Sequence, residues 1–207
     1  MEQVIRYVTP LCVVSASFED GCLVSLSLAA PHEAGVCGGE ASQTAGGQAH
    51  ALQPPFESLQ AMRRGGSLFS PRRGGIRVLP PVRIGATLPP CAAATLRFLE
   101  AYFSGAVPDS IPPTRLRGTT FRRAVWAELM TVPYGSVVTY GELGRRVAAR
   151  TGRHTSPRAV GQAVGHNPIA LVVPCHRVIA AHMRIGGYAY GAAMKAALLR
   201  IEGVDIH

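Results

Sequence analysis

The sequence predicts an α+β protein built from two unlike parts. Strand-like segments joined by turns fill the first thirty residues, whereas segments with the 3.6-residue apolar period of helices dominate from residue 92 onward. The charge divides in the same way, because residues 1–110 have no net charge and residues 111–207 carry a net charge of +9. We therefore expect an N-terminal α/β domain over residues 1–113 and a basic C-terminal domain over residues 114–207.

The N-terminal domain opens with the pattern of a β-hairpin followed by a third strand. Residues Gln3–Val8 and Leu11–Ser17 are strand-like, and the turn signal Glu19-Asp20-Gly21 precedes the strand-like segment Cys22–Leu28. We therefore expect consecutive strands joined by tight turns.

A glycine- and proline-rich insertion and one helix complete this domain. Residues 31–90 contain ten Gly and eight Pro, which predicts mostly loop with a short strand near Ile76–Leu79. From Ala92 to Ser104 apolar residues recur on one helical stripe, and Gly105 is a stop signal. The stripe comprises Leu96, Leu99 and Phe103. The residues Ile111-Pro112-Pro113 form the predicted linker.

The C-terminal domain begins with a predicted helix. Thr119 or Thr120 can cap it, and it runs to about Met130. Its inward face is expected to hold residues at i, i+4 and i+8, namely Phe121, Val125 and Leu129.

Two further helices follow a short predicted strand, Ser136–Thr139. The segment Tyr140–Arg150 is helical in pattern and would bury Leu143 and Val147. The next helix has Ser156 as N-cap and a proline at its first position. Two short helices joined by a tight connection in a basic domain are a helix-turn-helix candidate.

The last of these helices is made largely of small residues. Val160 and Val164 mark one face, and two glycines leave part of the remaining surface without side chains. A second face comprises Ala159, Gln162, Ala163 and His166. Small side chains allow close approach to a DNA groove, but they equally allow close packing against another helix.

Composition narrows the class of protein. A basic domain suits an anionic partner, and nucleic acid is the commonest, although a solvated basic surface remains the alternative. No run of 18 apolar residues exists, so we expect no membrane span. The first residues lack a signal-peptide pattern, which predicts an intracellular protein, in the nucleus if eukaryotic and otherwise in the cytoplasm.

One cysteine stands in a chemically suggestive setting. Cys175 follows the apolar run Leu171–Val173 and a proline, which predicts a strand or extended segment that ends at the cysteine. Its neighbour His176 can take up a proton, so Cys175 is a candidate nucleophile. The alternative is a packed core cysteine. The five cysteines form no CxxC pair, so neither a disulfide framework nor a cysteine-rich zinc ribbon is indicated.

Five sequence elements together resemble the O6-alkylguanine-DNA alkyltransferases over about residues 117–205. They are Ser156-Pro-Arg-Ala-Val-Gly161, Asn167-Pro168, Val173-Pro-Cys-His-Arg-Val178, Gly186-Gly-Tyr188, and Lys195 through Leu198-Leu199 to Glu202-Gly203. The resemblance implies a ribonuclease-H-like N-terminal domain and a winged helix-turn-helix alkyltransferase domain. It also implies direct-reversal repair, in which an alkyl group moves irreversibly from O6-alkylguanine, or O4-alkylthymine, to Cys175.

The resemblance assigns roles to residues. Cys175 would accept the alkyl group, His176 would take its proton through a water, Glu202 would orient the histidine, and Tyr140 would donate to guanine N3 and press on the flipped nucleotide's phosphate. Arg158 would fill the space left by the flipped base, and it would bind DNA with Ala159, Gln162 and Tyr140. The implied substrate-pocket residues, including the supporting Asn167 and Lys195, are Asn167, Val178, Gly186, Tyr188, Ala189 and Lys195.

The implied partner is double-stranded DNA that contains O6-alkylguanine, bound by a monomer, with no cofactor. Some members of the family bind a structural zinc ion in the N-terminal half. Cys12, Cys22 and His32 do not align with the zinc ligands of those relatives, so we expect no metal. The alternatives are a winged-helix DNA-binding regulator with an inert cysteine and a cysteine hydrolase, although adjacent residues rarely form a catalytic dyad. A relative that binds alkylated DNA without repairing it would lack the cysteine.

Overall fold

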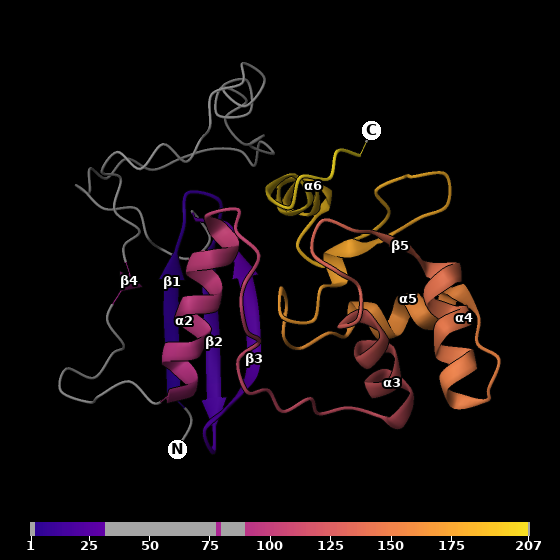
Figure 1. The fold of residues 1–207 in the computed structure, drawn as a ribbon, viewed down its shortest axis with the longest axis horizontal. Coiled ribbons are helices and arrows are strands. Elements are labelled where there is room, and N and C mark those ends of the chain that lie inside the picture. Colours follow the sequence, from indigo (N-terminus) through magenta and orange to yellow (C-terminus); the bar gives the residue numbers. More distant parts are fainter. Residues whose placement is uncertain (1–2, 32–77, 80–89, 207) are drawn as a thin grey trace, which may run out of the picture.

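The N-terminal part of the chain forms a four-stranded antiparallel sheet with the order β3-β2-β1-β4 (Figure 1). The computed structural model describes residues 3–31, 78–79 and 90–206. The strands are β1 (Gln3–Val8), β2 (Val13–Glu19), β3 (Cys22–Ala29) and β4 (Val78–Leu79). The predicted strands are confirmed with end shifts of one or two residues, whereas most of the predicted insertion over 31–90 lies outside the described residues.

A tight turn and one helix complete this half. Asp20 and Gly21 both have positive φ, at 46° and 71°, which suits the right-handed twist of a hairpin. The helix α2 (Pro90–Phe103) lies over one face of the sheet, along its strands (Figure 1), and buries Leu99, Tyr102 and Phe103. It ends before Gly105, whose φ of 79° is the left-handed conformation of a helix stop, as predicted.

The C-terminal part contains three mutually contacting helices, α3 (Thr120–Leu129), α4 (Tyr140–Thr151) and α5 (Pro157–Gly165). The side chains of Thr119, Thr139 and Ser156 cap them by accepting backbone N–H bonds. The predicted helices and the caps at Thr119 and Ser156 are therefore confirmed. The predicted strand before α4 is shorter than expected, because only β5 (Val138–Thr139) pairs, parallel to β6 (Val178–Ile179).

Two expectations about this half are wrong. Phe121 is exposed, because it lies in the first turn of α3, and Trp126 instead fills the space between helices, with its indole N–H donating to Ala163 O at 2.9 Å. The run Leu171–Val173 is a turn and not a strand, since Leu171 has a φ of 67° and Val173 N donates back to Ile169 O. Cys175 consequently lies in a short 3-10 helix, η2 (Cys175–Arg177).

The free edge of β3 joins the two halves. The backbone of Leu23 forms hydrogen bonds with the residues on both sides of Thr114. The backbone of Leu26 forms the same pair of hydrogen bonds with the residues on both sides of Ile169. The residues predicted as a linker therefore lead directly into strand-like pairing with the sheet. The last helix, α6 (Ala192–Ile201), packs against η2. Among the described residues, no helix is long and apolar enough to cross a membrane.

Candidate active site

Cys175 is held in a buried position by backbone and side-chain bonds. Its side chain is 6% exposed, and its N–H donates to Val173 O at 2.8 Å. The Asn167 side-chain amide donates to Cys175 Sγ at 3.1 Å and to Val173 O at 2.7 Å. The turn after α5 thus fixes the thiol from one side.

The environment of Cys175 keeps its thiol protonated near neutral pH. Burial raises the pKa of Cys175 above its ordinary value, and the hydrogen bond from Asn167 and the charge of Lys195 only partly oppose this effect. Because the thiolate is the reactive form, the site needs a base.

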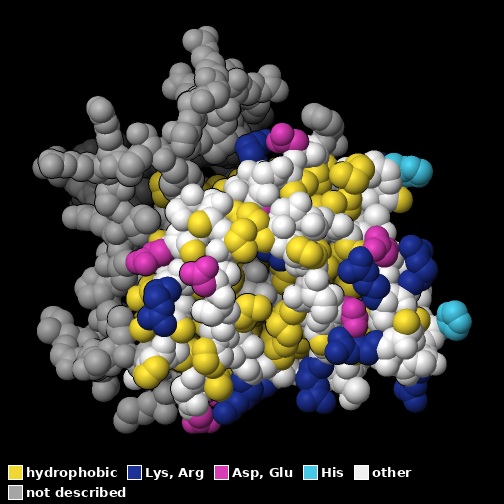
Figure 2. Space-filling view, viewed as in Figure 1, with side chains coloured by type: hydrophobic (Ala, Val, Ile, Leu, Met, Phe, Trp, Pro, Cys, Tyr) yellow, Lys and Arg dark blue, Asp and Glu magenta, His cyan; other side chains and the backbone are white. Residues whose placement is uncertain are grey.

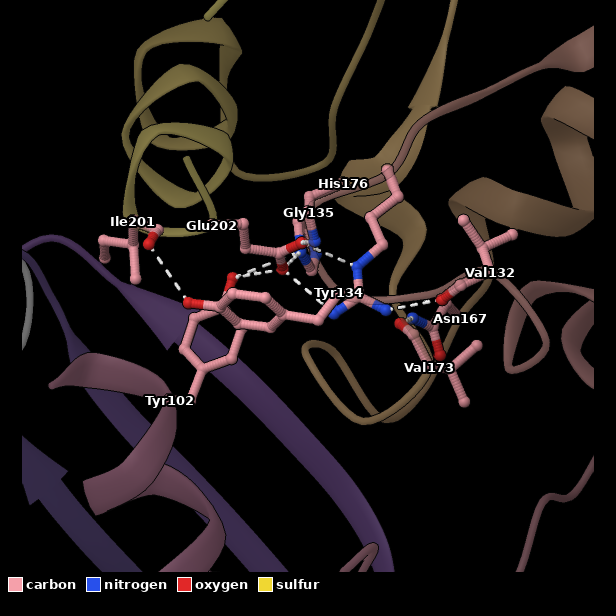
Figure 3. Close-up of polar contacts among 10 residues, drawn as sticks. Tyr102, Val132, Tyr134, Gly135, Asn167, Val173, His176, Ile201 and Glu202 are labelled. Carbon is pink, nitrogen blue, oxygen red and sulfur yellow. Dashed lines mark hydrogen bonds and ion pairs between the residues drawn. The ribbon is translucent and has the colours of Figure 1, made fainter. Parts of the chain in front are cut away.

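His176, the residue after the cysteine, pairs with Glu202 (Figure 3). His176 is fully buried, and its Nε2 lies 2.6 Å from Glu202 Oε1. An ionised carboxylate only accepts hydrogen bonds, so Nε2 carries the proton of the neutral ring. The other nitrogen, Nδ1, is buried, has no hydrogen-bond partner among the described residues and is free to accept a proton.

Glu202 is ionised because several donors surround it. Arg177 donates from Nε to Oε2 at 2.8 Å and from Nη2 to Oε1 at 3.0 Å, and Gly135 N–H donates to Oε2 at 3.0 Å. Burial alone would raise the pKa of Glu202, but the bonds from His176 and Arg177 outweigh it and lower the pKa to about 2. Burial lowers the pKa of His176, which keeps the ring neutral.

A pocket of about 410 Å³ opens beside Cys175. It is lined by Tyr140, Gly161, Val164, Gly165, Cys175, Gly187, Tyr188 and Ala189. The hydroxyl of Tyr140 donates to Gly187 O at 3.4 Å, and the hydroxyl of Tyr188 is buried. The pocket therefore places two aromatic rings with their hydroxyl groups next to a thiol.

Lys195 supports the wall of this pocket from α6. Its side chain is fully buried, and Nζ donates to the carbonyls of Val178 and Ile185 at 2.5 Å and of Gly187 at 3.3 Å. Burial lowers the pKa of Lys195 to about 8. One ammonium thus ties β6 to the loop that precedes Tyr188.

The predicted site residues fall into three places. Cys175, His176 and Glu202 are buried and form, with the partly exposed Asn167 that contacts the thiol, one group that we call the buried cluster, and Tyr140, Tyr188 and Ala189 line the pocket beside Cys175. The other predicted pocket residues are not among those that line it: Lys195 Nζ donates to Val178 O, and a Cβ on Gly186 would lie 3.3 Å from Ala180 N and 3.6 Å from Cε2 of Tyr140.

The predicted DNA-binding residues of α5 lie apart from the thiol. Ala159 and Gln162 line a groove of about 360 Å³ between α3 and α5. Arg158 is exposed in the first turn of α5. Lys and Arg side chains gather over this helical half in the view of Figure 2.

Sequence reasoning missed two contributors to the buried cluster. Arg177 received no role, although an arginine inside an otherwise apolar buried segment is a signal for an internal ion pair. Tyr102 was also missed, because nothing in α2 indicates that it reaches a glutamate 100 residues away. Within the described residues, no group of three or more His, Cys, Asp or Glu side chains could hold a metal ion.

Comparison with known proteins places this geometry in a family. The DNA-binding domain of 6-O-methylguanine DNA methyltransferase matches residues 120–204. A methylated-DNA–protein-cysteine methyltransferase from Mycolicibacterium paratuberculosis is 45% identical over 123 residues, which cover 59% of this chain and 72% of that protein. The chain belongs to the methylated-DNA–protein-cysteine methyltransferase family.

Other members of the methyltransferase family show the extent of the likeness. The Mycobacterium bovis methyltransferase is 47% identical over 104 residues, half of this chain, and the match spans only 61% of that relative's length. The crystal structure of Mycobacterium tuberculosis OGT in complex with DNA superposes with a TM-score of 0.59 at 28% identity, covering 97% of this chain and 91% of that one.

Proposed function

We propose that this protein repairs DNA by moving a methyl or small alkyl group from O6-alkylguanine, and from O4-alkylthymine, to its own Cys175. The observation that carries the proposal is the thiol itself, buried, lining a pocket of about 410 Å³ and accompanied by a His176–Glu202 pair at 2.6 Å. Family membership and the DNA complex of the M. tuberculosis relative support the substrate class.

The buried cluster activates the thiol. His176 takes the proton of Cys175 at Nδ1, the nitrogen left without a partner, through a bridging water. The imidazolium that forms is stabilised by Glu202, which is already ionised and bound at Nε2. This is the nucleophile, base and orienting-group logic of other covalent catalysts.

Alkyl transfer is a displacement at an sp³ carbon. The sulfur of Cys175 forms a bond to the alkyl carbon as the bond from that carbon to guanine O6 breaks, and the electron pair stays on guanine. Tyr140 donates a hydrogen bond to guanine N3 as this charge develops, and the proton that His176 took from the thiol passes to the released guanine. The product is a thioether, so each molecule reacts once.

DNA engagement is assigned to the C-terminal half. The damaged base is flipped into the pocket, Arg158 fills its place in the stack, and Ala159 and Gln162 approach the groove. We also propose that residues 114–207 act as a winged helix-turn-helix domain, that residues 1–113 are a ribonuclease-H-like domain, and that a monomer binds. The net charge of +9 on residues 111–207 suits a phosphate backbone.

The test is to weigh the intact protein after incubation with a duplex that contains O6-methylguanine. The expected result is a single added methyl group on Cys175, absent in Cys175→Ala and retained in Cys12→Ala. Cys12 is a suitable control because burial raises its pKa to about 11 and it lies in the N-terminal sheet region. An unchanged mass in folded protein with lesion-independent DNA binding would instead indicate a winged-helix regulator.

A further inference from the structure

Tyr102 reaches from the N-terminal half into the buried cluster (Figure 3). Its side chain is fully buried, and its hydroxyl donates to Glu202 Oε1 at 2.9 Å. The hydroxyl oxygen of Tyr102 also lies 3.1 Å from His176 Nε2. A residue of α2 therefore touches both members of the pair that would activate the thiol.

The hydrogen-bond arrangement leaves one role for this hydroxyl. Burial and the nearby Glu202 charge raise the pKa of Tyr102 well above its ordinary value, so the phenol stays protonated and donates. Glu202 Oε1 then accepts from three groups, which are Tyr102, His176 and Arg177. Each donor shares the carboxylate charge and so limits how strongly the carboxylate attracts the proton of the imidazole.

The ring of Tyr102 also restrains the ring of His176. The two rings meet edge to face, with centroids 6.0 Å apart and planes at 82°. A flip of the imidazole about its Cβ–Cγ bond would put Cε1 in the place of Nε2 and Cδ2 in the place of Nδ1, so the ring would lose its bond to Glu202 and the free nitrogen would leave its position. The Tyr102 oxygen, 3.1 Å from Nε2, opposes that flip because a ring carbon cannot take the place of Nε2 in this hydrogen-bond arrangement.

We propose that Tyr102 is a positioning residue for alkyl transfer, through which the N-terminal half orients His176 and sets the basicity of that ring. The proposal rests on the proposed function, in which His176 takes the thiol proton. It gives the N-terminal sheet and α2 a part in the chemistry of a site whose sequence motif lies entirely in the C-terminal half.

The direction of the effect follows from the groups that face His176. These are Glu202 and Lys195 from the C-terminal segment, Arg177 and Cys175 beside it in η2, and Tyr102 from α2. Without the phenol hydroxyl, Glu202 Oε1 loses one of its three donors and stabilises the imidazolium more strongly. The pKa of His176 should then rise, and a larger fraction of the base should be already protonated at mildly acidic pH.

Tyr102→Phe tests the proposal, with Tyr134→Phe as the matched control. Tyr134 packs against Tyr102 with ring centroids 5.9 Å apart, but its hydroxyl donates to a backbone carbonyl, that of Ile201, at 3.0 Å. Single-turnover transfer from an O6-methylguanine duplex is followed against DNA concentration and pH. For Tyr102→Phe we expect the rate constant at saturating DNA to fall about tenfold, because the hydroxyl no longer holds His176 in position. The DNA concentration at half-saturation should stay unchanged, and the acidic limb of the pH–rate profile should move to higher pH.

Two measurements keep the outcome decisive. Nitrogen-15 NMR titration of His176 in DNA-free protein should show a higher pKa in Tyr102→Phe than in the parent, whether or not the parent repairs DNA. Replacement of Tyr102 by 3,5-difluorotyrosine, a stronger donor of similar size, should move the pKa in the opposite direction. An unchanged His176 titration and pH profile would overturn the proposal and leave a structural tyrosine. A parent protein that transfers no alkyl group would overturn the proposed function alone.

Discussion

Asn167 donates its side-chain amide to Cys175 Sγ at 3.1 Å while the backbone next to it pairs with the N-terminal sheet. Its other amide contacts reach Val173 O at 2.7 Å and the N–H of Ile169, which donates to Oδ1 at 3.0 Å. Because Leu26 of β3 bonds on both sides of Ile169, the sheet edge fixes the turn that fixes the thiol.

Asn167→Asp should therefore reduce the reactivity of Cys175 through its charge and its lost donor. Aspartate can still accept from Ile169, but it cannot donate to Sγ and it places a negative charge beside the thiol. We expect the pKa of Cys175 to rise further and methyl transfer to fall by about tenfold or more. The pH dependence of Cys175 alkylation by iodoacetamide checks this, and an unchanged profile would contradict it. Asn167→Ala, which loses the donor without adding charge, should show the smaller shift of the two.

Glu202 should make stability depend on acidic pH. Its pKa is about 2 in the folded protein against an ordinary value of 4.5, so its contribution is present above pH 4.5 and is lost as the pH falls toward 2. A shift of this size corresponds to a free energy of unfolding on the order of 3 kcal/mol. Urea unfolding between pH 2 and pH 6 should show this loss in the parent. Glu202→Gln should have a smaller free energy of unfolding at pH 6 than the parent, and it should lack the loss that the parent shows between pH 4.5 and pH 2. Parallel curves of unfolding free energy against pH for the two proteins would contradict the assignment.

Local signals in the sequence predicted most of the described helices and strands. Thr119 and Ser156 identified helix starts because an N-cap acts within three residues of itself. Val160 and Val164 marked the buried face of α5 because one helix turn brings i and i+4 together. Such signals need no knowledge of the rest of the fold.

The errors and omissions have a common cause, which is dependence on distant partners. The apolar run Leu171–Val173 is compatible with a strand or a buried turn, and only its lack of a strand partner decides between them. The inward place expected for Phe121 belongs to Trp126, whose partner is on α5. The motif around Cys175 indicated the chemistry, but the contact of Tyr102 with Glu202 depends on how two halves of the chain pack.

Arg158→Ala should separate base flipping from chemistry. Arg158 is exposed in the first turn of α5 and outside the pocket, so its loss should not alter reaction with a substrate that needs no flipping. We expect repair of a duplex to slow by about tenfold or more, and reaction with free O6-methylguanine base to change by about twofold or less. Arg153→Ala, which removes the same charge from the exposed α4–α5 connection, is the control. Equal losses on duplex and free base would contradict an intercalating role.

Gly161→Ala should narrow the pocket and so reduce the transfer of large alkyl groups more than that of small ones. Gly161 lines the pocket within α5, and an added Cβ would lie 3.6 Å from Cε1 and 3.7 Å from Cδ1 of Tyr140, which is ordinary contact without a clash. The helix should tolerate alanine and gain up to about 1 kcal/mol of stability, while the pocket loses the volume of a methyl group.

Transfer of a methyl group by Gly161→Ala should stay within about threefold of the parent, whereas transfer from O6-benzylguanine should fall by about tenfold or more. The measurement is the ratio of the two single-turnover rate constants in the same preparation. Gly141→Ala is the matched control, because a Cβ at that helical glycine of α4 would meet no atom within 4 Å and the residue does not line the pocket. Since the benzyl-to-methyl ratio cancels differences in active fraction, an unchanged ratio in Gly161→Ala would show that this face of α5 does not limit the size of the alkyl group.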